Sequence, residues 1–216
     1  MFTGEGIQQQ LKKICIIGNH NMMNKGLTLV ELLVSIGIFG VLVTGLISMF
    51  MSAVDAQQSV LQNQELLNQG SYVTEYMDRA IRMALRDDGT VGIAGECTGT
   101  SDKNYGVASG SITFLSYDIV AGDYKCKRFI LDNNKIWERK SIDTTAANLQ
   151  SAVEITSSKV KIVSFNVVVD GDVVDTNQPK VTFLISMESN SQRRLNPVPS
   201  MIFQTTVSQR NLNISN

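Results

Sequence analysis

One long uncharged stretch constrains the fold of this chain more than any other feature. It covers residues 32–54 and reads LLVSIGIFGVLVTGLISMFMSAV, and a helix needs about 20 apolar residues to cross a bilayer core. Basic residues precede the stretch and acidic residues follow it: Lys12, Lys13 and Lys25 on one side, and Asp55, Glu65 and Glu75 on the other. The positive-inside rule therefore places the N-terminus in the cytoplasm and the bulk of the chain outside it.

Glu31 stands at the edge of this span, where a carboxylate is costly and usually has a partner. No basic side chain lies within one or two helical turns on its C-terminal side. If the chain were cut after Gly26, the new α-amino group of Leu27 would lie four residues before Glu31, on the same helix face. The alternative is a carboxylate that contacts lipid headgroups and water at the membrane edge.

Residues 25–33, KGLTLVELL, resemble the signature of type IV prepilins. That signature has a basic residue before a glycine, then a hydrophobic residue, Thr-Leu-x-Glu and an apolar helix. The resemblance implies that prepilin peptidase cuts after Gly26 and methylates the amine of Leu27, although the family mostly carries Phe at that first position. Glycine also suits the cut, because a residue without Cβ allows close approach of the backbone in a protease site.

The leader of residues 1–26 is long for this family. Residues 22–26, MMNKG, would alone form an ordinary short leader, so we expect translation to start at Met22 or Met23. Cys15 and the only histidine, His20, lie in the leader and are expected to be lost with it.

An amphipathic helix is predicted beyond the membrane segment. We assign residues 27–56 to a transmembrane or filament-core helix and residues 57–86 to its continuation, because apolar residues there recur mostly at steps of three and four. These apolar residues are Val60, Leu67, Val73, Tyr76, Met77, Ala80, Ile81, Ala84 and Leu85. Oppositely charged pairs four residues apart, Glu75 with Arg79 and Asp78 with Arg82, suit the solvent-facing side.

Residues 87–216 are predicted to form a β-rich head, because the composition changes to Asp, Gly, Ser and Thr around alternating apolar runs. Strands are expected near residues 112–117, 124–131, 135–139, 161–169, 181–187 and 202–207. Residues 132–135, DNNK, and 170–172, DGD, look like turns. The fold class is therefore α+β and pilin-like, with a long N-terminal helix packed on one twisted antiparallel sheet.

Cys97 and Cys126 are the only cysteines beyond the leader. In an oxidising compartment such a pair indicates a disulfide, which would contribute roughly 3 kcal/mol by closing a loop of about 30 residues. A zinc site would need more ligands than two cysteines. Asp170 and Asp172 could begin a calcium loop, but further carboxylates at regular spacing are missing, which favours a turn. We expect no metal site and no cofactor.

An enzymatic function has little support in the sequence. The exported part has no histidine, no Gly-x-Ser-x-Gly elbow, no glycine-rich phosphate loop and no cluster of metal ligands, whereas a Ser/Lys or paired-carboxylate enzyme stays open. A net charge of -1 with scattered basic residues gives no footprint for nucleic acid.

The family resemblance favours a structural and assembly subunit over an enzyme. The layout is similar to minor pilins of the PilW type, with J-type pseudopilins of type II secretion and a signal-anchored extracellular binding module as alternatives. Residues 77–82, MDRAIR, and 203–211, FQTTVSQRN, carry this finer similarity. It implies a single pass through the bacterial inner membrane before entry into a pilus or pseudopilus. The implied partners are other pilins or pseudopilins, prepilin peptidase, the inner-membrane assembly platform and membrane lipid.

Overall fold

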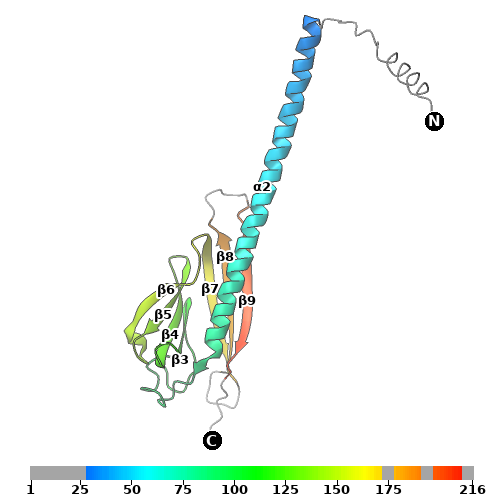
Figure 1. Ribbon diagram of the computed structural model, residues 1–216. Helices are drawn as coiled ribbons and strands as arrows, with labels where there is room; N and C mark the ends of the chain where they lie inside the picture. Colours follow the sequence, from blue (N-terminus) through cyan, green and yellow to red (C-terminus); the bar gives the residue numbers. More distant parts are fainter. Residues whose placement is uncertain (1–27, 172–177, 191–196, 211–216) are drawn as a thin grey trace, which may run out of the picture. The chain divides into compact units, whose positions relative to one another are not determined.

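The computed structural model describes residues 28–171, 178–190 and 197–210, and its backbone divides into two compact units, residues 1–52 and 53–216. One helix, α2 (Leu29–Arg82), contributes residues to both units. The strands all belong to the second unit, which is the head (Figure 1). The α+β architecture predicted from the sequence is confirmed.

Helix α2 ends at Arg82 rather than near Arg86. Arg79 and Arg82 occupy its last turn, where positive charge complements the helix dipole. Directly after it, Ala84 and Leu85 form the short strand β1, which pairs with Ser116 and Leu115. The apolar periodicity that suggested helix up to Leu85 is overridden, because these two residues gain ladder hydrogen bonds and burial in the sheet.

The larger sheet has six strands, all antiparallel. They are β1 (Ala84–Leu85), β2 (Gly106–Ala108), β3 (Ser111–Asp118), β4 (Asp123–Asp132), β5 (Lys135–Ser141) and β6 (Leu149–Glu154), with a short 3-10 helix, η1 (Ala146–Asn148), before β6. Their order is β1-β3-β4-β5-β6, and β2 also pairs with β3. Asn133 and Asn134 adopt left-handed conformations with φ of 49° and 61°, so the turn predicted between β4 and β5 is confirmed.

The smaller sheet has three strands, β7 (Val160–Asp170), β8 (Lys180–Ser189) and β9 (Ser200–Ser208), in the order β7-β8-β9. The expectation of one sheet is therefore wrong, although each predicted strand is present. Strand β7 pairs along its length with β8 and not with β6, and the links to the larger sheet are few. Among them, the backbone N–H of Ile162 donates to the carbonyl of Asn134 at 2.8 Å.

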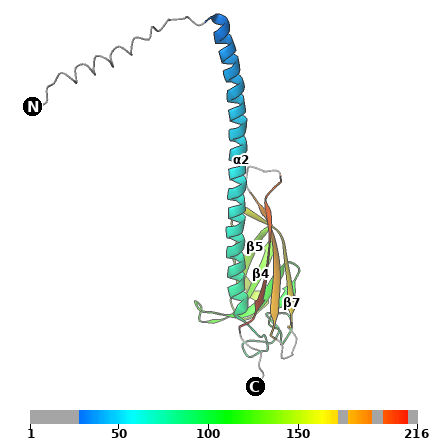
Figure 2. The same ribbon diagram turned by 90° about the vertical axis from the view of Figure 1, so that its right-hand side faces the viewer.

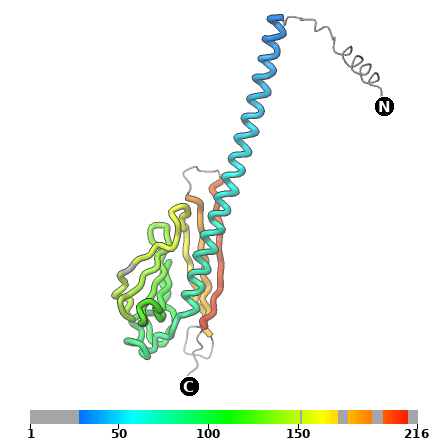
Figure 3. The backbone as a smooth tube through the Cα atoms, in the orientation of Figure 1, coloured from blue at the N-terminus to red at the C-terminus, as the bar shows by residue number. Residues whose placement is uncertain are grey.

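The core of the head lies between α2 and both sheets. The helix buries one stripe, Leu66, Gly70, Val73, Met77 and Ile81. Phenylalanines from both sheets complete the cluster: Phe114 and Phe129 from the larger sheet, and Phe165 and Phe183 from the smaller one. Figures 2 and 3 show the head part of α2 running along one side of the strands, with β8 and β9 beside it. Helical packing thus joins two sheets whose strands form separate ladders.

Gly70 marks the closest approach of α2 to the smaller sheet. A Cβ built on Gly70 would lie 2.0 Å from Cζ of Phe203 on β9, a separation that non-bonded carbon atoms do not tolerate. Glycine costs a helix interior about 1 kcal/mol relative to alanine. This position is therefore occupied by a poor helix former because the aromatic ring fills the space of a side chain.

A double-mutant cycle tests this contact. Gly70→Ala in the parent should lower the free energy of unfolding by about 1–3 kcal/mol, because the methyl group displaces the ring of Phe203. In a Phe203→Ala background the same change should instead stabilise by up to about 1 kcal/mol, because only the helix preference remains. Urea unfolding of the full chain in detergent measures both values. An equal effect of Gly70→Ala in the two backgrounds would contradict the contact.

Candidate functional site

The predicted processing site lies at the start of α2. Gly26 and Leu27 fall outside the described residues, and Thr28 is the first residue that the structure describes. Glu31 lies in the first turn of the helix and is exposed. The structure thus places the carboxylate just after the predicted cut and leaves the cut itself as a prediction.

Thr28 caps the helix, a role that the sequence analysis missed. Its Oγ1 accepts a hydrogen bond from the backbone N–H of Glu31 at 3.2 Å, and its carbonyl accepts one from the N–H of Leu32 at 3.1 Å. A threonine followed three residues later by glutamate is the sequence pattern of a capping box, and this signal was available in Thr-Leu-Val-Glu. Thr28 and Glu31 therefore help to start the helix, in addition to forming part of the prepilin-like sequence pattern.

Glu31 has a second local role, because a negative charge in the first turn interacts favourably with the helix dipole. Within the part of the chain that the structure describes, no ion pair involves Glu31. Pairing with the amine of Leu27 stays a prediction.

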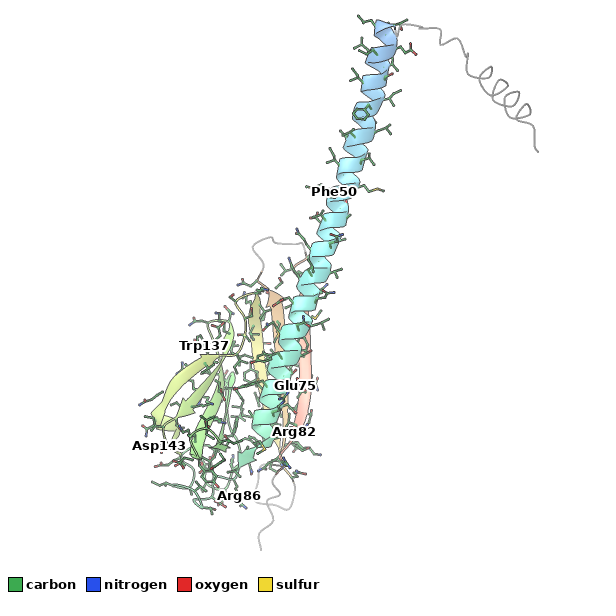
Figure 4. All side chains as sticks on the ribbon, in the orientation of Figure 1. Phe50, Glu75, Arg82, Arg86, Trp137 and Asp143 are labelled. Atoms are coloured by element: carbon green, nitrogen blue, oxygen red, sulfur yellow. A yellow bond between two sulfur atoms is a disulfide. The ribbon has the colours of Figure 1, made fainter. Side chains whose placement is uncertain are left out.

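The apolar segment of α2 makes almost no contact within the chain. Phe50 is 68% exposed and Leu46 66% exposed, and Figure 4 shows side chains projecting outward around this part of the helix. A Cβ on Gly37, Gly40 or Gly45 would meet nothing within 4 Å. By length and composition, α2 is the one described helix that could cross a membrane, with a mean hydropathy of 2.4 in its most apolar window.

The hydroxyl groups in this segment are satisfied by the helix itself. Ser35, Thr44, Ser48 and Ser52 each donate a hydrogen bond to a backbone carbonyl three or four residues earlier, at 2.8–3.1 Å. A polar group in hydrocarbon costs several kcal/mol unless it is hydrogen-bonded. These residues can therefore lie in an apolar environment without an external partner.

In the head, the predicted disulfide between Cys97 and Cys126 is confirmed. It joins the loop after β1 to strand β4, and both cysteines are buried together with Leu115. This small cluster covers the side of the larger sheet that faces away from α2. The cross-link closes a loop with a sequence separation of 29, for which unfolded-state entropy gives roughly 3 kcal/mol.

Asp87 organises the cysteine loop, and nothing in the sequence identified it. It is 2% exposed, and its Oδ2 accepts hydrogen bonds from the backbone N–H groups of Cys97 (3.0 Å) and Thr98 (2.9 Å) and from the Thr98 hydroxyl (3.1 Å). Its backbone also bonds to Lys103 and Asp102. A buried carboxylate is stable when several donors surround it, so Asp87 holds the loop that carries Cys97.

A second polar group links α2 to the larger sheet. The hydroxyl of Tyr76 donates to Glu138 at 2.7 Å, and Glu138 is only 3% exposed. Burial, followed by the hydrogen bond to Glu138, raises the pKa of Tyr76 above its ordinary value, so the phenol stays a donor. Lys140 lies 4.0 Å from Glu138 and 3.5 Å from Asp118. The Tyr76–Glu138 hydrogen bond thus joins the helix to the sheet, and Lys140 balances the two carboxylates within the sheet.

Metal-ligating residues do not gather in the described ranges, which contain no group of three or more His, Cys, Asp or Glu suited to a metal ion. Asp172, the second carboxylate of the calcium alternative, lies outside those ranges. A groove of about 580 Å³ is lined by Leu61, Gln62 and Glu65 of α2 and by residues at the ends of β7 and β8. It brings no catalytic constellation together.

Comparison with known families matched residues 21–47 to the prokaryotic N-terminal methylation motif. The match includes Gly26, Leu27 and Glu31, and a motif of this kind supports a pilin- or pseudopilin-type function in general. Together with the apolar helix, it fits a single-pass membrane-anchored protein. No curated protein and no solved structure matched the chain.

The role assigned to Asp87 gives a prediction with a neighbouring control. Asp87→Asn should lower the free energy of unfolding by about 1–3 kcal/mol, because the buried donors lose a charged acceptor. Asp88→Asn, which changes an exposed carboxylate bonded only within its own turn, should change it by no more than about 0.5 kcal/mol. Urea unfolding of the oxidised protein compares the two, and equal losses would contradict the role of Asp87.

Proposed function

We propose that this protein is a minor pilin-like structural and assembly subunit of a type IV pilus, with no reaction of its own. The observation that carries the proposal is the methylation motif at residues 21–47. The motif supports a peptidase site just ahead of α2 and an N-terminal amine close to Glu31 in its first turn. The apolar side chains that follow in the helix are largely exposed.

Assembly would begin with removal of residues 1–26. Cleavage after Gly26 creates a positive amine on Leu27, four residues before Glu31, and opposite charges at this spacing meet on one helix face. A buried carboxylate is tolerated only where a positive charge meets it. In the growing filament, Glu31 of one subunit would pair with the amine of a neighbour and so set the register between them.

The exposed apolar segment supports the same mechanism. Residues such as Leu46 and Phe50 are more than half exposed, and water is a poor environment for so much apolar surface. Lipid would cover them before assembly, and the helices of other pilins would cover them afterwards. An added Cβ on Gly37, Gly40 or Gly45 would meet nothing within 4 Å among the described residues, and glycines at such positions allow neighbouring helices to approach closely.

The head would lie outside the cytoplasm, where the Cys97–Cys126 disulfide can form and persist. A J-type pseudopilin is the second candidate, because the motif is shared by pilins and pseudopilins. A signal-anchored binding module is the third, and it would need no prepilin peptidase.

Substitution at the cut tests processing. Gly26→Val should leave uncut precursor in the membrane, because a β-branched residue blocks the close backbone approach that cleavage requires. Gly45→Val, deeper in the apolar helix where a side chain meets nothing in this chain, should still be cut. Immunoblotting of membrane fractions resolves precursor from product. Cleavage of Gly26→Val at the parent rate would rule out this peptidase site.

Substitution of Glu31 tests the register mechanism separately from the cap. Glu31→Gln removes the charge, yet glutamine also suits the third helical position of a capping box, so helix start, insertion and cleavage should be unchanged. Incorporation into sheared pili should fall at least about tenfold, the loss expected when a buried charge loses its partner. Glu75→Gln, an exposed carboxylate on the same helix, is the matched control. Normal incorporation of Glu31→Gln at equal abundance would return Glu31 to a solvated carboxylate at the membrane edge.

A further inference from the structure

Two arginines lie directly opposite each other in the larger sheet. Arg128 on β4 is the cross-strand partner of Arg139 on β5. Because side chains alternate along a strand, both lie on the same side of the sheet as Cys126, away from the side where Phe129 and Glu138 face α2. Like charges directly opposite destabilise an antiparallel pair, so this arrangement calls for a compensating negative charge.

The described contacts compensate Arg128 poorly. Its Nε donates to Oγ1 of Thr113 at 2.8 Å, a neutral acceptor. The pKa of Arg128 is lowered, first by burial and then by the positive charge of Arg139, and no carboxylate contributes to the shift. The guanidinium therefore keeps unused donors in a partly buried position.

Arg139 is also undercompensated. A guanidinium nitrogen of Arg139 lies 3.9 Å from Oδ2 of Asp132, with the side chains 40% and 47% exposed. Such an exposed ion pair contributes little stabilisation. The Nε atom of Arg139 is shielded from solvent and has no hydrogen-bond partner. On the adjacent strand β6, Oε1 of Glu154 forms an ion pair with Nζ of Lys135 at 2.6 Å, so this carboxylate already has a cationic partner.

Arg128 also lines a cavity of about 240 Å³, whose lining residues do not include Arg139. The hydroxyl residues Thr98, Ser111 and Thr113 contribute to its wall. Glu96 is the acidic residue of the wall, and its Oε2 accepts a hydrogen bond from the Thr145 hydroxyl at 2.7 Å. An anion would therefore be attracted to the arginine end of the cavity and repelled from the Glu96 end, which fixes its position.

We propose that Arg128 and Arg139 form a binding site for a carboxylate or phosphate group of an extracytoplasmic ligand. The strand register places both arginines on the same side of the sheet, and the planar guanidinium group of each can bind such an anion through two N–H donors. The hydroxyl group of Thr113, held by Arg128, fixes the orientation of one fork. This site lies in the head and does not depend on assembly through α2.

Thermal unfolding of the full-length protein in detergent tests the site, with sodium phosphate and sodium citrate as separate probes and sodium chloride at matched ionic strength as the reference. We expect phosphate, citrate or both to raise the Tm of the parent above the chloride value, and to raise it more than in variants that lack either arginine. An anion that binds only the folded state stabilises it, whereas the general stabilisation by excluded anions acts on all variants alike. The two arms distinguish a phosphate from a carboxylate ligand. A Tm that follows ionic strength alone with both probes would overturn the proposal.

Three variants locate the effect. Arg128→Gln and Arg139→Gln should each weaken anion binding at least about tenfold, the loss expected for charged hydrogen bonds, while their Tm in chloride stays equal to or above the parent value because the repulsion is removed. Lys161→Gln removes the same charge from the smaller sheet and should keep the parent response. An undiminished anion response in both arginine variants would overturn the site. If either glutamine variant unfolds, Arg128→Lys keeps the charge but loses the fork, and it should weaken the response.

Discussion

Burial of one stripe of α2 is the interaction on which the rest of the head depends. The larger and smaller sheets form separate ladders, so backbone pairing alone does not unite them. Leu66, Val73, Met77 and Ile81 are fully buried between the sheets and the helix, and each such side chain contributes about 1.5–3 kcal/mol. Gly70 lets the ring of Phe203 approach the helix. The helix that carries the exposed apolar segment is thus also the element that holds the head together.

The larger sheet is buried against α2 on one side and covered only around the cysteine cluster on the other, and its charges differ between the two sides. Strand β3 faces the α2 core through Phe114 and the cystine cluster through Leu115. On the helix side, Tyr76 satisfies the buried carboxylate of Glu138. On the cystine side, the described contacts leave the Arg128 and Arg139 pair short of negative charge. The same sheet therefore combines one satisfied polar contact with one that is available to a ligand.

Much of this arrangement could be predicted from the sequence, because its signals are local. The apolar span, the alternation in the longest strands, the Asn133-Asn134 turn and the one pair of cysteines beyond residue 26 each follow from short patterns. Strand β1 could not be predicted, because tertiary pairing overrides the helical pattern of Ala84 and Leu85. The division into two sheets depends on which strands pair, and Asp87 depends on a loop that brings Thr98 to it. Neither the two-sheet division nor the role of Asp87 has a local sequence signal. The Thr28 cap does have one, the capping-box pattern Thr-Leu-Val-Glu, which the sequence analysis missed.

The central claim is that residues 1–26 are a leader removed at a prepilin site, so that α2 begins close to a free amine. Intact-mass measurement with N-terminal sequencing of the protein recovered from the membrane and from sheared surface material tests it most directly. The account predicts a chain that begins at Leu27 and carries the mass of one added methyl group. A surface form that retains the leader, or that begins at a residue other than Leu27, would contradict it.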